Sequence, residues 1–114
     1  MDLFKALQKK RDEMKPESIR LSSLDQDFQV MRPLLSHRAM LIANDKAKDK
    51  KLYAFLVVAI CWWKDGQRVI DELGADECIA LLDVLDEDDF LALYEKCSEL
   101  VKATPKDVED AQKN

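Results

Sequence analysis

Glycine and histidine are scarce in this sequence. Its two glycines, Gly66 and Gly74, stand apart, whereas a loop that cradles phosphate needs several glycines at close spacing. His37 is the only histidine, and the neighbouring Ser36 points elsewhere on a helix, so no Ser–His–acid or Cys–His site can be assembled locally. We therefore expect no enzymatic activity and no cofactor.

Cysteine pairs at metal-binding or redox spacing are absent too. Cys61, Cys78 and Cys97 are odd in number and far apart, with no Cys-x-x-Cys pair. We expect them to be reduced, apolar core residues. The acidic run 86–89 lacks the alternating spacing around a central glycine that a calcium loop needs, and helix capping accounts for it better. We expect no metal site.

The longest apolar run, Leu52–Trp63, has only twelve residues. A helix that crosses a bilayer needs about 20 apolar residues, so we expect no membrane span. The first residues lack the apolar stretch of a signal peptide and the pattern for myristoylation. The expected location is the cytoplasm.

Charge is unevenly spread along the chain. Residues 1–51 carry 12 basic and 8 acidic side chains, whereas residues 52–114 carry 6 basic and 15 acidic ones. This acidic balance argues against a nucleic-acid partner, which usually requires a basic domain. A dipolar chain can steer toward a charged protein partner, although a solvated surface without a special partner explains the pattern equally well.

Apolar spacing predicts that the run 52–63 is a helix that ends at Gly66. Because it is apolar on nearly every side, other segments or a partner chain must cover it. Further helices are expected from Asp2 to about Met14, from Pro33 to Asn44, from Asp76 to Leu85, and from Asp86, with Asp89 as the reciprocal capping residue, to Thr104. Residues 45–51 are expected to form a charged connector, and Val69, Ile70 and Leu73 to pack inward.

Residues 17–35 allow two interpretations. Ile19/Leu21 and Phe28/Val30 alternate as in two short strands, whereas Leu24, Phe28, Met31 and Leu35 fit a helix. We favour extended structure before Pro33. The predicted fold is mainly α, a small single-domain helical bundle with a short extended or β segment around residues 19–32. Its expected parts are a peripheral N-terminal helix (1–15), a helical core domain (16–104) and a flexible C-terminal tail (105–114).

This order of segments resembles the tail assembly chaperones of long-tailed bacteriophages. The resemblance covers residues 27–101 and rests on an extended stretch that leads into a helix, an apolar helix closing with Lys64-Asp65-Gly66, and two capped helices. The sequence departs from the family at Val101-Lys102, where many relatives have Asn-Gly, and in its added basic helix 1–15.

The resemblance implies a function in virion assembly. Such chaperones bind the tape-measure protein in the host cytoplasm, keep it soluble while tail-tube protein polymerises around it, and are absent from the mature virion. Many also exist in a longer form made by ribosomal frameshifting. The ending Gln112-Lys113-Asn114 can be encoded by a slippery run of codons, and sequencing the end of the gene would test that idea.

A partner surface can be placed on the two apolar helices, 52–63 and 87–101. We expect them to frame a groove for a helical client, formed by Trp62, Trp63, Tyr94, Phe55, Phe90, Asp86 and Glu87. On a helix the two tryptophans point about 100° apart, with Trp63 toward the core and Trp62 on the rim. Core packing is the alternative for both. A rim position predicts that Trp62→Ala costs less than about 1.5 kcal/mol, and a core position roughly 3–5 kcal/mol.

A protein of another class also fits these features. A small acidic helical adaptor or inhibitor that caps one folded host protein would have the same composition. Self-association is compatible with either function. The form of the partner discriminates between them, because a chaperone binds several copies along a long chain and an adaptor binds one compact protein.

Overall fold

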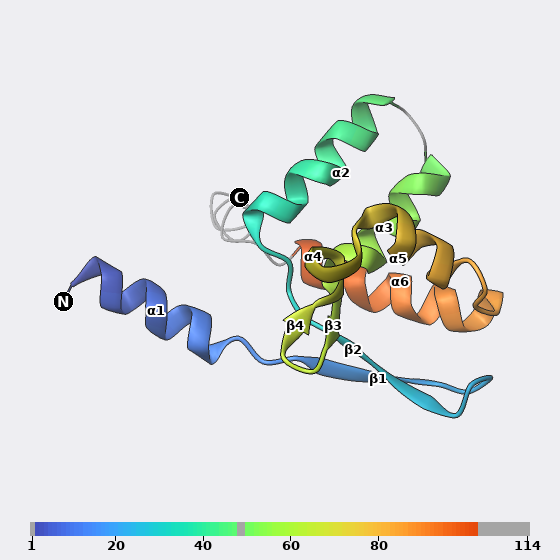
Figure 1. Ribbon diagram of the computed structural model, residues 1–114, viewed down its shortest axis with the longest axis horizontal. Coiled ribbons are helices and arrows are strands. Elements are labelled where there is room, and N and C mark those ends of the chain that lie inside the picture. Colours follow the sequence, from blue (N-terminus) through green and yellow to red (C-terminus); the bar gives the residue numbers. More distant parts are fainter. Residues whose placement is uncertain (1, 48–49, 103–114) are drawn as a thin grey trace, which may run out of the picture.

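The computed structural model describes residues 2–47 and 50–102. These residues form a mixed, mainly helical domain of six helices and one four-stranded antiparallel sheet (Figure 1). In chain order the elements are α1 (Leu3–Glu13), β1 (Glu17–Leu21), β2 (Gln26–Val30), α2 (Leu35–Ala47), α3 (Lys50–Cys61), β3 (Trp62–Lys64), β4 (Gln67–Arg68), α4 (Val69–Leu73), α5 (Ala75–Leu82) and α6 (Glu87–Lys102). The strands follow one another across the sheet in sequence order.

The hairpin of β1 and β2 confirms the extended interpretation of residues 17–30, and the helical alternative is wrong. Ile19 pairs with Phe28, and the alternating residues Phe28 and Val30 turn one face of β2 into the core. The turn between the strands includes Asp25 at φ 53°, in the left-handed region that Asp tolerates better than most residues. Period-two alternation therefore outweighed the helical spacing in this segment.

The sheet is larger than the sequence predicts, because the apolar run 52–63 does not remain helical to its end. Helix α3 stops at Cys61, and Trp62 begins a strand that pairs with Val30 of β2. The next turn places Asp65 at φ 51° and Gly66 at φ 80°, as a two-residue hairpin turn requires. Gly66 thus closes a hairpin and does not end a helix, so the expectation that both tryptophans lie on a helix is wrong.

Several helix boundaries also differ from expectation. Residues 45–47 extend α2, and α3 begins at Lys50, so most of the expected connector 45–51 is helical. Lysine and alanine are good helix formers, which explains the extension. Helix α5 ends at Leu82 and has Gly74, not Asp76, at its N-cap. Val69 and Ile70 are buried as expected, whereas Leu73 is exposed. The tail 105–114 and the end at Thr104 lie outside the described residues.

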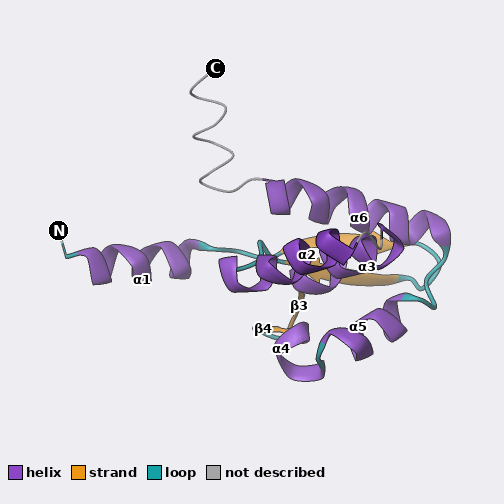
Figure 2. Cartoon of the chain, turned by 90° about the horizontal axis from the view of Figure 1, so that it is seen from above, coloured by secondary structure: helices purple, strands orange, loops and turns teal. Residues whose placement is uncertain are grey.

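Helix α1 begins at the expected cap, where the Asp2 carboxylate accepts a hydrogen bond of 3.1 Å from the backbone N–H of Phe4. It contains no buried residue. In both whole-chain views α1 extends away from the other elements (Figures 1 and 2). Three large apolar side chains on it, Leu3, Phe4 and Leu7, remain exposed. The proposed division of the chain into parts stays a prediction.

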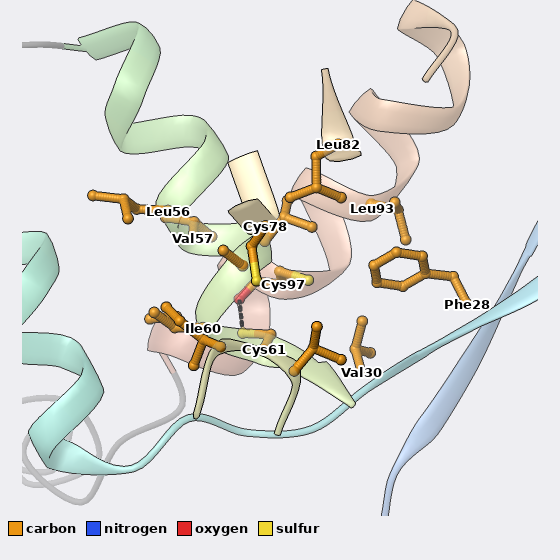
Figure 3. Close-up of a cluster of buried hydrophobic side chains, with 14 of the residues drawn as sticks. Phe28, Val30, Leu56, Val57, Ile60, Cys61, Cys78, Leu82, Leu93 and Cys97 are labelled. Atoms are coloured by element: carbon orange, nitrogen blue, oxygen red, sulfur yellow. Dashed lines mark hydrogen bonds between the residues drawn. The ribbon is translucent and has the colours of Figure 1, made fainter. Parts of the chain in front are cut away.

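The core forms around α3. All six residues from Leu56 to Cys61 are buried. Figure 3 shows how side chains of other elements surround that segment: Phe28 and Val30 from β2, Cys78 and Leu82 from α5, and Leu93 and Cys97 from α6. Segments of the same chain therefore cover the apolar helix.

The three cysteines are free and fully buried, which confirms the prediction of reduced core residues. The Cys61 thiol points at the backbone carbonyl of Cys97, with 3.9 Å between sulfur and oxygen. A hydrogen bond between the Cys61 and Cys97 side chains, together with burial, raises the pKa of the Cys97 thiol. Burial also raises the pKa of Cys78, assisted by the charge of Glu77. The thiols of Cys78 and Cys97 therefore stay neutral in the folded protein under conditions that ionise exposed cysteines.

We expect the folded protein to resist thiol-directed reagents at about pH 8, whereas the chain in denaturant reacts at all three cysteines. Only the unfolded chain can ionise Cys78 and Cys97 near the ordinary thiol pKa of about 8.5, so the free energy of unfolding should fall as the pH rises above it. An aromatic disulfide reagent measures the labelling, with Ser18→Cys as an exposed, fast-reacting control. If the native cysteines of the folded protein are labelled as fast as the cysteine of Ser18→Cys, they are accessible to solvent and the prediction is wrong.

Candidate partner-binding surface

The structure separates the two tryptophans onto opposite faces of the sheet, as successive residues of a strand require. Trp62 lies on the core face, where its ring stacks on Phe28 with 5.0 Å between centroids and 23° between planes. It packs against the buried cluster and is half-buried. Most of the Trp62 side chain is therefore engaged within the domain.

The other three aromatic candidates lie where α3 meets α6. The rings of Phe55 and Phe90 are 4.8 Å apart and tilted by 43°. Tyr94, one turn further along α6, is half-buried and packs against the core cluster. These contacts join α3 to α6. The residues that were expected to line an open groove between the two helices therefore pack against each other and fill that space. What they contribute to partner binding stays a prediction.

Trp63 lies on the outer face of the sheet, over Arg68. The guanidinium carbon of Arg68 is 5.6 Å from the centroid of the Trp63 ring, in a cation–π contact. Arg68 is buried, and its Nη2 donates a hydrogen bond of 2.7 Å to the carbonyl oxygen of Arg32. Burial lowers the pKa of Arg68, and the nearby Asp71 opposes that effect. Arg68, held by its hydrogen bond to Arg32, thus packs against one face of the Trp63 ring and fixes its position.

A hollow of about 450 Å³ opens beside Trp63, between the β3–β4 hairpin and α4. Leu34 adds an apolar wall, and Asp71 and Glu72 add carboxylates. The distance between Oδ1 of Asp71 and Nε2 of the buried His37 is 2.8 Å. An apolar wall beside carboxylates can take an apolar side chain of a partner together with a neighbouring lysine or arginine.

The acidic candidates lie elsewhere. Asp86 and Glu87 are exposed at the start of α6, beyond the end of α5 and away from the β3–β4 hairpin in both whole-chain views (Figures 1 and 2). The structure therefore does not bring the seven sequence-predicted residues into one site. It places four near the core, Trp63 at the hollow and two at the far end of the molecule.

Asp89 has a role that the sequence interpretation missed. It was expected to be the reciprocal capping residue of α6, but its side chain is buried and faces the β1–β2 turn. Its Oδ2 accepts a hydrogen bond of 3.3 Å from the backbone N–H of Ser23 and a second one from the Ser23 hydroxyl. Asp89 thereby fixes the hairpin turn against the beginning of α6.

Within the described residues, no group of three His, Cys, Asp or Glu side chains is arranged to hold a metal ion. None of the helices in that part of the chain has the length and apolar character needed to cross a membrane. The chain matches no family model, no curated protein and no solved structure.

The hollow beside Trp63 was only partly visible in the sequence. Trp63 was a candidate, but Leu34, Arg68 and Asp71 come from other segments and carry no motif. The Asp65-Gly66 pair was the usable signal, because Asp-Gly between two strands indicates a tight hairpin and places Trp63 on its outer face.

Proposed function

We propose that this protein is a phage tail assembly chaperone that binds the tape-measure protein in the host cytoplasm, keeps it soluble and supports assembly of the tail tube. The proposal begins with the order of segments over residues 27–101. The observation that carries it is the hollow beside Trp63, whose lining combines Leu34 with two carboxylates, Asp71 and Glu72, and one buried cation, Arg68. A long helical client presents apolar side chains at regular spacing, and such side chains need reversible cover until the tube protein encloses them.

The charges on this surface favour a client helix with basic residues beside its apolar face. Asp71 and Glu72 stand at the hollow, and both side chains are exposed. The net charge of −5 adds solubility to a complex that contains an aggregation-prone partner. Contacts of this kind are individually weak, which suits a chaperone that must release its client.

The proposal predicts that a large helical protein is encoded just downstream of this gene, and the test is co-expression with that protein. We expect that protein to be insoluble alone and soluble when several copies of this chain bind along it. Leu34→Asp places a charge in the hollow and should reduce co-purification at least about tenfold, a loss of about 1.4 kcal/mol. Ile42→Asp is the matched control, because Ile42 is also exposed but lies outside the residues that line the hollow.

Two results would contradict the proposal. A downstream protein whose solubility is unaffected by this chain would remove the chaperone function. Equal losses for Leu34→Asp and Ile42→Asp would remove the hollow as the contact site, even if the chaperone function holds. Sequencing the codons for Gln112-Lys113-Asn114 separately tests the longer, frameshifted form.

The alternative is an adaptor or inhibitor of one folded host protein. The hollow beside Trp63 supports it, because the β3–β4 hairpin that forms one wall leaves room for one protruding side chain of a compact partner. Stoichiometry in the co-purified complex separates the two functions. One copy per compact partner supports the adaptor, and several copies per extended partner support the chaperone.

A further inference from the structure

The apolar face of α1 is uncovered. Leu3, Phe4 and Leu7 are 72%, 65% and 58% exposed, and none of the helix is buried. Its charged residues are four basic ones, Lys5, Lys9, Lys10 and Arg11, and two acidic ones, Asp12 and Glu13, so the helix is basic on balance. An isolated helix of this length is marginal in water, because helices shorter than about 12–15 residues lack enough hydrogen bonds to offset nucleation. Burying the apolar face against another surface would therefore stabilise both the helix and the contact.

A hollow of about 300 Å³ continues this apolar face toward the start of α2. Its apolar lining is Leu7, Met14, Pro33, Leu34, Leu35 and Leu100. Every charged side chain that lines it is basic: Lys10, Arg11, Arg32 and Arg38. The Nε atom of Arg38 is buried without a hydrogen-bond partner. We call α1 together with this hollow the basic end, and its chemistry fits an apolar surface that carries carboxylates.

A surface of that kind lies on the same chain, around the start of α6. Val84, in the α5–α6 turn, is 80% exposed, and Leu91 on the first turns of α6 is 51% exposed. Exposed carboxylates stand among them on Asp86, Glu87 and Asp88. We call these residues and the adjoining β1–β2 turn the acidic end.

The contact between Asp89 and Ser23 keeps the acidic end together, since it fixes the β1–β2 turn against α6. Leu24 in that turn is 54% exposed and adds to the apolar surface. The acidic end is thus a surface that side-chain contacts hold together, whereas α1 is an extended arm.

The two ends cannot meet within one molecule. In both whole-chain views α1 extends from one side and the α5–α6 turn lies at the opposite side (Figures 1 and 2). We propose that a second copy of this chain is the occupant: the basic end of one molecule docks head-to-tail on the acidic end of the next. Such a contact joins two different patches, so each molecule can bind one neighbour through its basic end and another through its acidic end. Repetition of this contact gives a ring or an open chain.

The proposal predicts a defined response to salt. Apolar contacts supply the attraction at the centre, and pairs between basic and acidic rims set the orientation. Because the rim charges are exposed, salt screens them within about 10 Å at 0.1 M. Self-association should therefore be strongest at low ionic strength and weaken as salt is added.

The experiment measures the molar mass of the full chain by light scattering over a concentration series, at about 0.05 M and about 0.5 M salt. The wild-type chain should form dimers or larger species that dissociate with salt. Lys10→Glu/Arg11→Glu makes the basic end acidic, and Asp86→Lys/Glu87→Lys makes the acidic end basic. Each double variant alone should raise the dissociation constant at least tenfold. Mixed together they should associate again, because each then offers the end that the other lacks.

Lys64→Glu is the control, because this exposed residue of the β3–β4 hairpin belongs to neither end. It should associate like the wild type. Circular dichroism checks that every variant is folded. A wild-type chain that stays monomeric at all concentrations overturns the proposal. So does an Asp86→Lys/Glu87→Lys variant that still self-associates, since that result indicates a symmetric contact through α1. Leu34 lines both hollows, but all variants in this assay keep it. The assay also contains only this chain, so its outcome does not depend on the client experiment.

Discussion

Trp62→Ala should lower the free energy of unfolding by about 3 kcal/mol, roughly twice the limit set by a rim position on a helix. Trp62 stacks on Phe28, packs against the buried cluster and pairs through its backbone with Val30. Removing the indole leaves a cavity on the core face of the sheet beside Phe28, in addition to the lost apolar burial. The expected cost lies at the lower end of the range for such truncations because the side chain is only half-buried.

Trp63→Ala is the matched control. Its ring lies on the outer face, and the loss is a cation–π contact with Arg68, worth about 0.5–1 kcal/mol, together with modest burial. We expect a cost below about 1.5 kcal/mol from Trp63→Ala and a larger effect on partner binding. Urea unfolding gives both values if the slope with denaturant stays constant. Equal costs for the two tryptophans would contradict their placement on opposite faces of the sheet.

The sequence predicted those elements whose signals are local. Asp2 and Pro16 bracket α1, and the alternation around Ile19 and Phe28 marks the first hairpin. In each case the capping residue or the period is contained within a few neighbouring positions. Burial of the three cysteines was also predictable, because free cysteine behaves as a small apolar residue. Their gathering around α3 was not, since it depends on the packing of α5 and α6.

The end of the apolar run shows why a periodic pattern can mislead. Trp63 falls on the helical stripe of Leu52 and Phe55, so spacing alone continues the helix through it. The partner of Trp62, however, is Val30, which lies 32 positions earlier in the chain. Pairing with β2 and the Asp65-Gly66 turn together favour a strand, and only the second of these is visible locally.

The candidate site was harder to predict for the same reason. Leu34, Arg68 and Asp71 meet at Trp63 only after the hairpin and α4 have folded. None belongs to a motif, and Arg68 resembles an ordinary surface charge in the sequence although it is buried. Reasoning from residue type assigned the aromatic side chains to one groove, whereas the packing of α3 against α6 uses Phe55 and Phe90 inside the domain.

Leu93→Ala should lower the free energy of unfolding by roughly 2–5 kcal/mol. Leu93 is completely buried, and Figure 3 shows it among side chains from β2, α3 and α5. Truncation removes apolar burial and leaves a cavity that these elements cannot close without moving the sheet. Denaturant unfolding at low protein concentration and high salt measures the loss, because those conditions exclude any stabilisation by self-association.

Leu91→Ala provides the matched control, since it is the same substitution two residues earlier in α6. Both variants change helix propensity equally, so the difference between them isolates packing. Leu91 is 51% exposed and should cost less than about 0.5 kcal/mol. Similar losses of unfolding free energy from the two variants would mean that a face of α6 other than the one with Leu93 packs on the core. Because Leu91 lies in the acidic end, Leu91→Ala should also weaken head-to-tail association while leaving the monomer stable, an effect that Leu93→Ala cannot imitate without destabilising the fold.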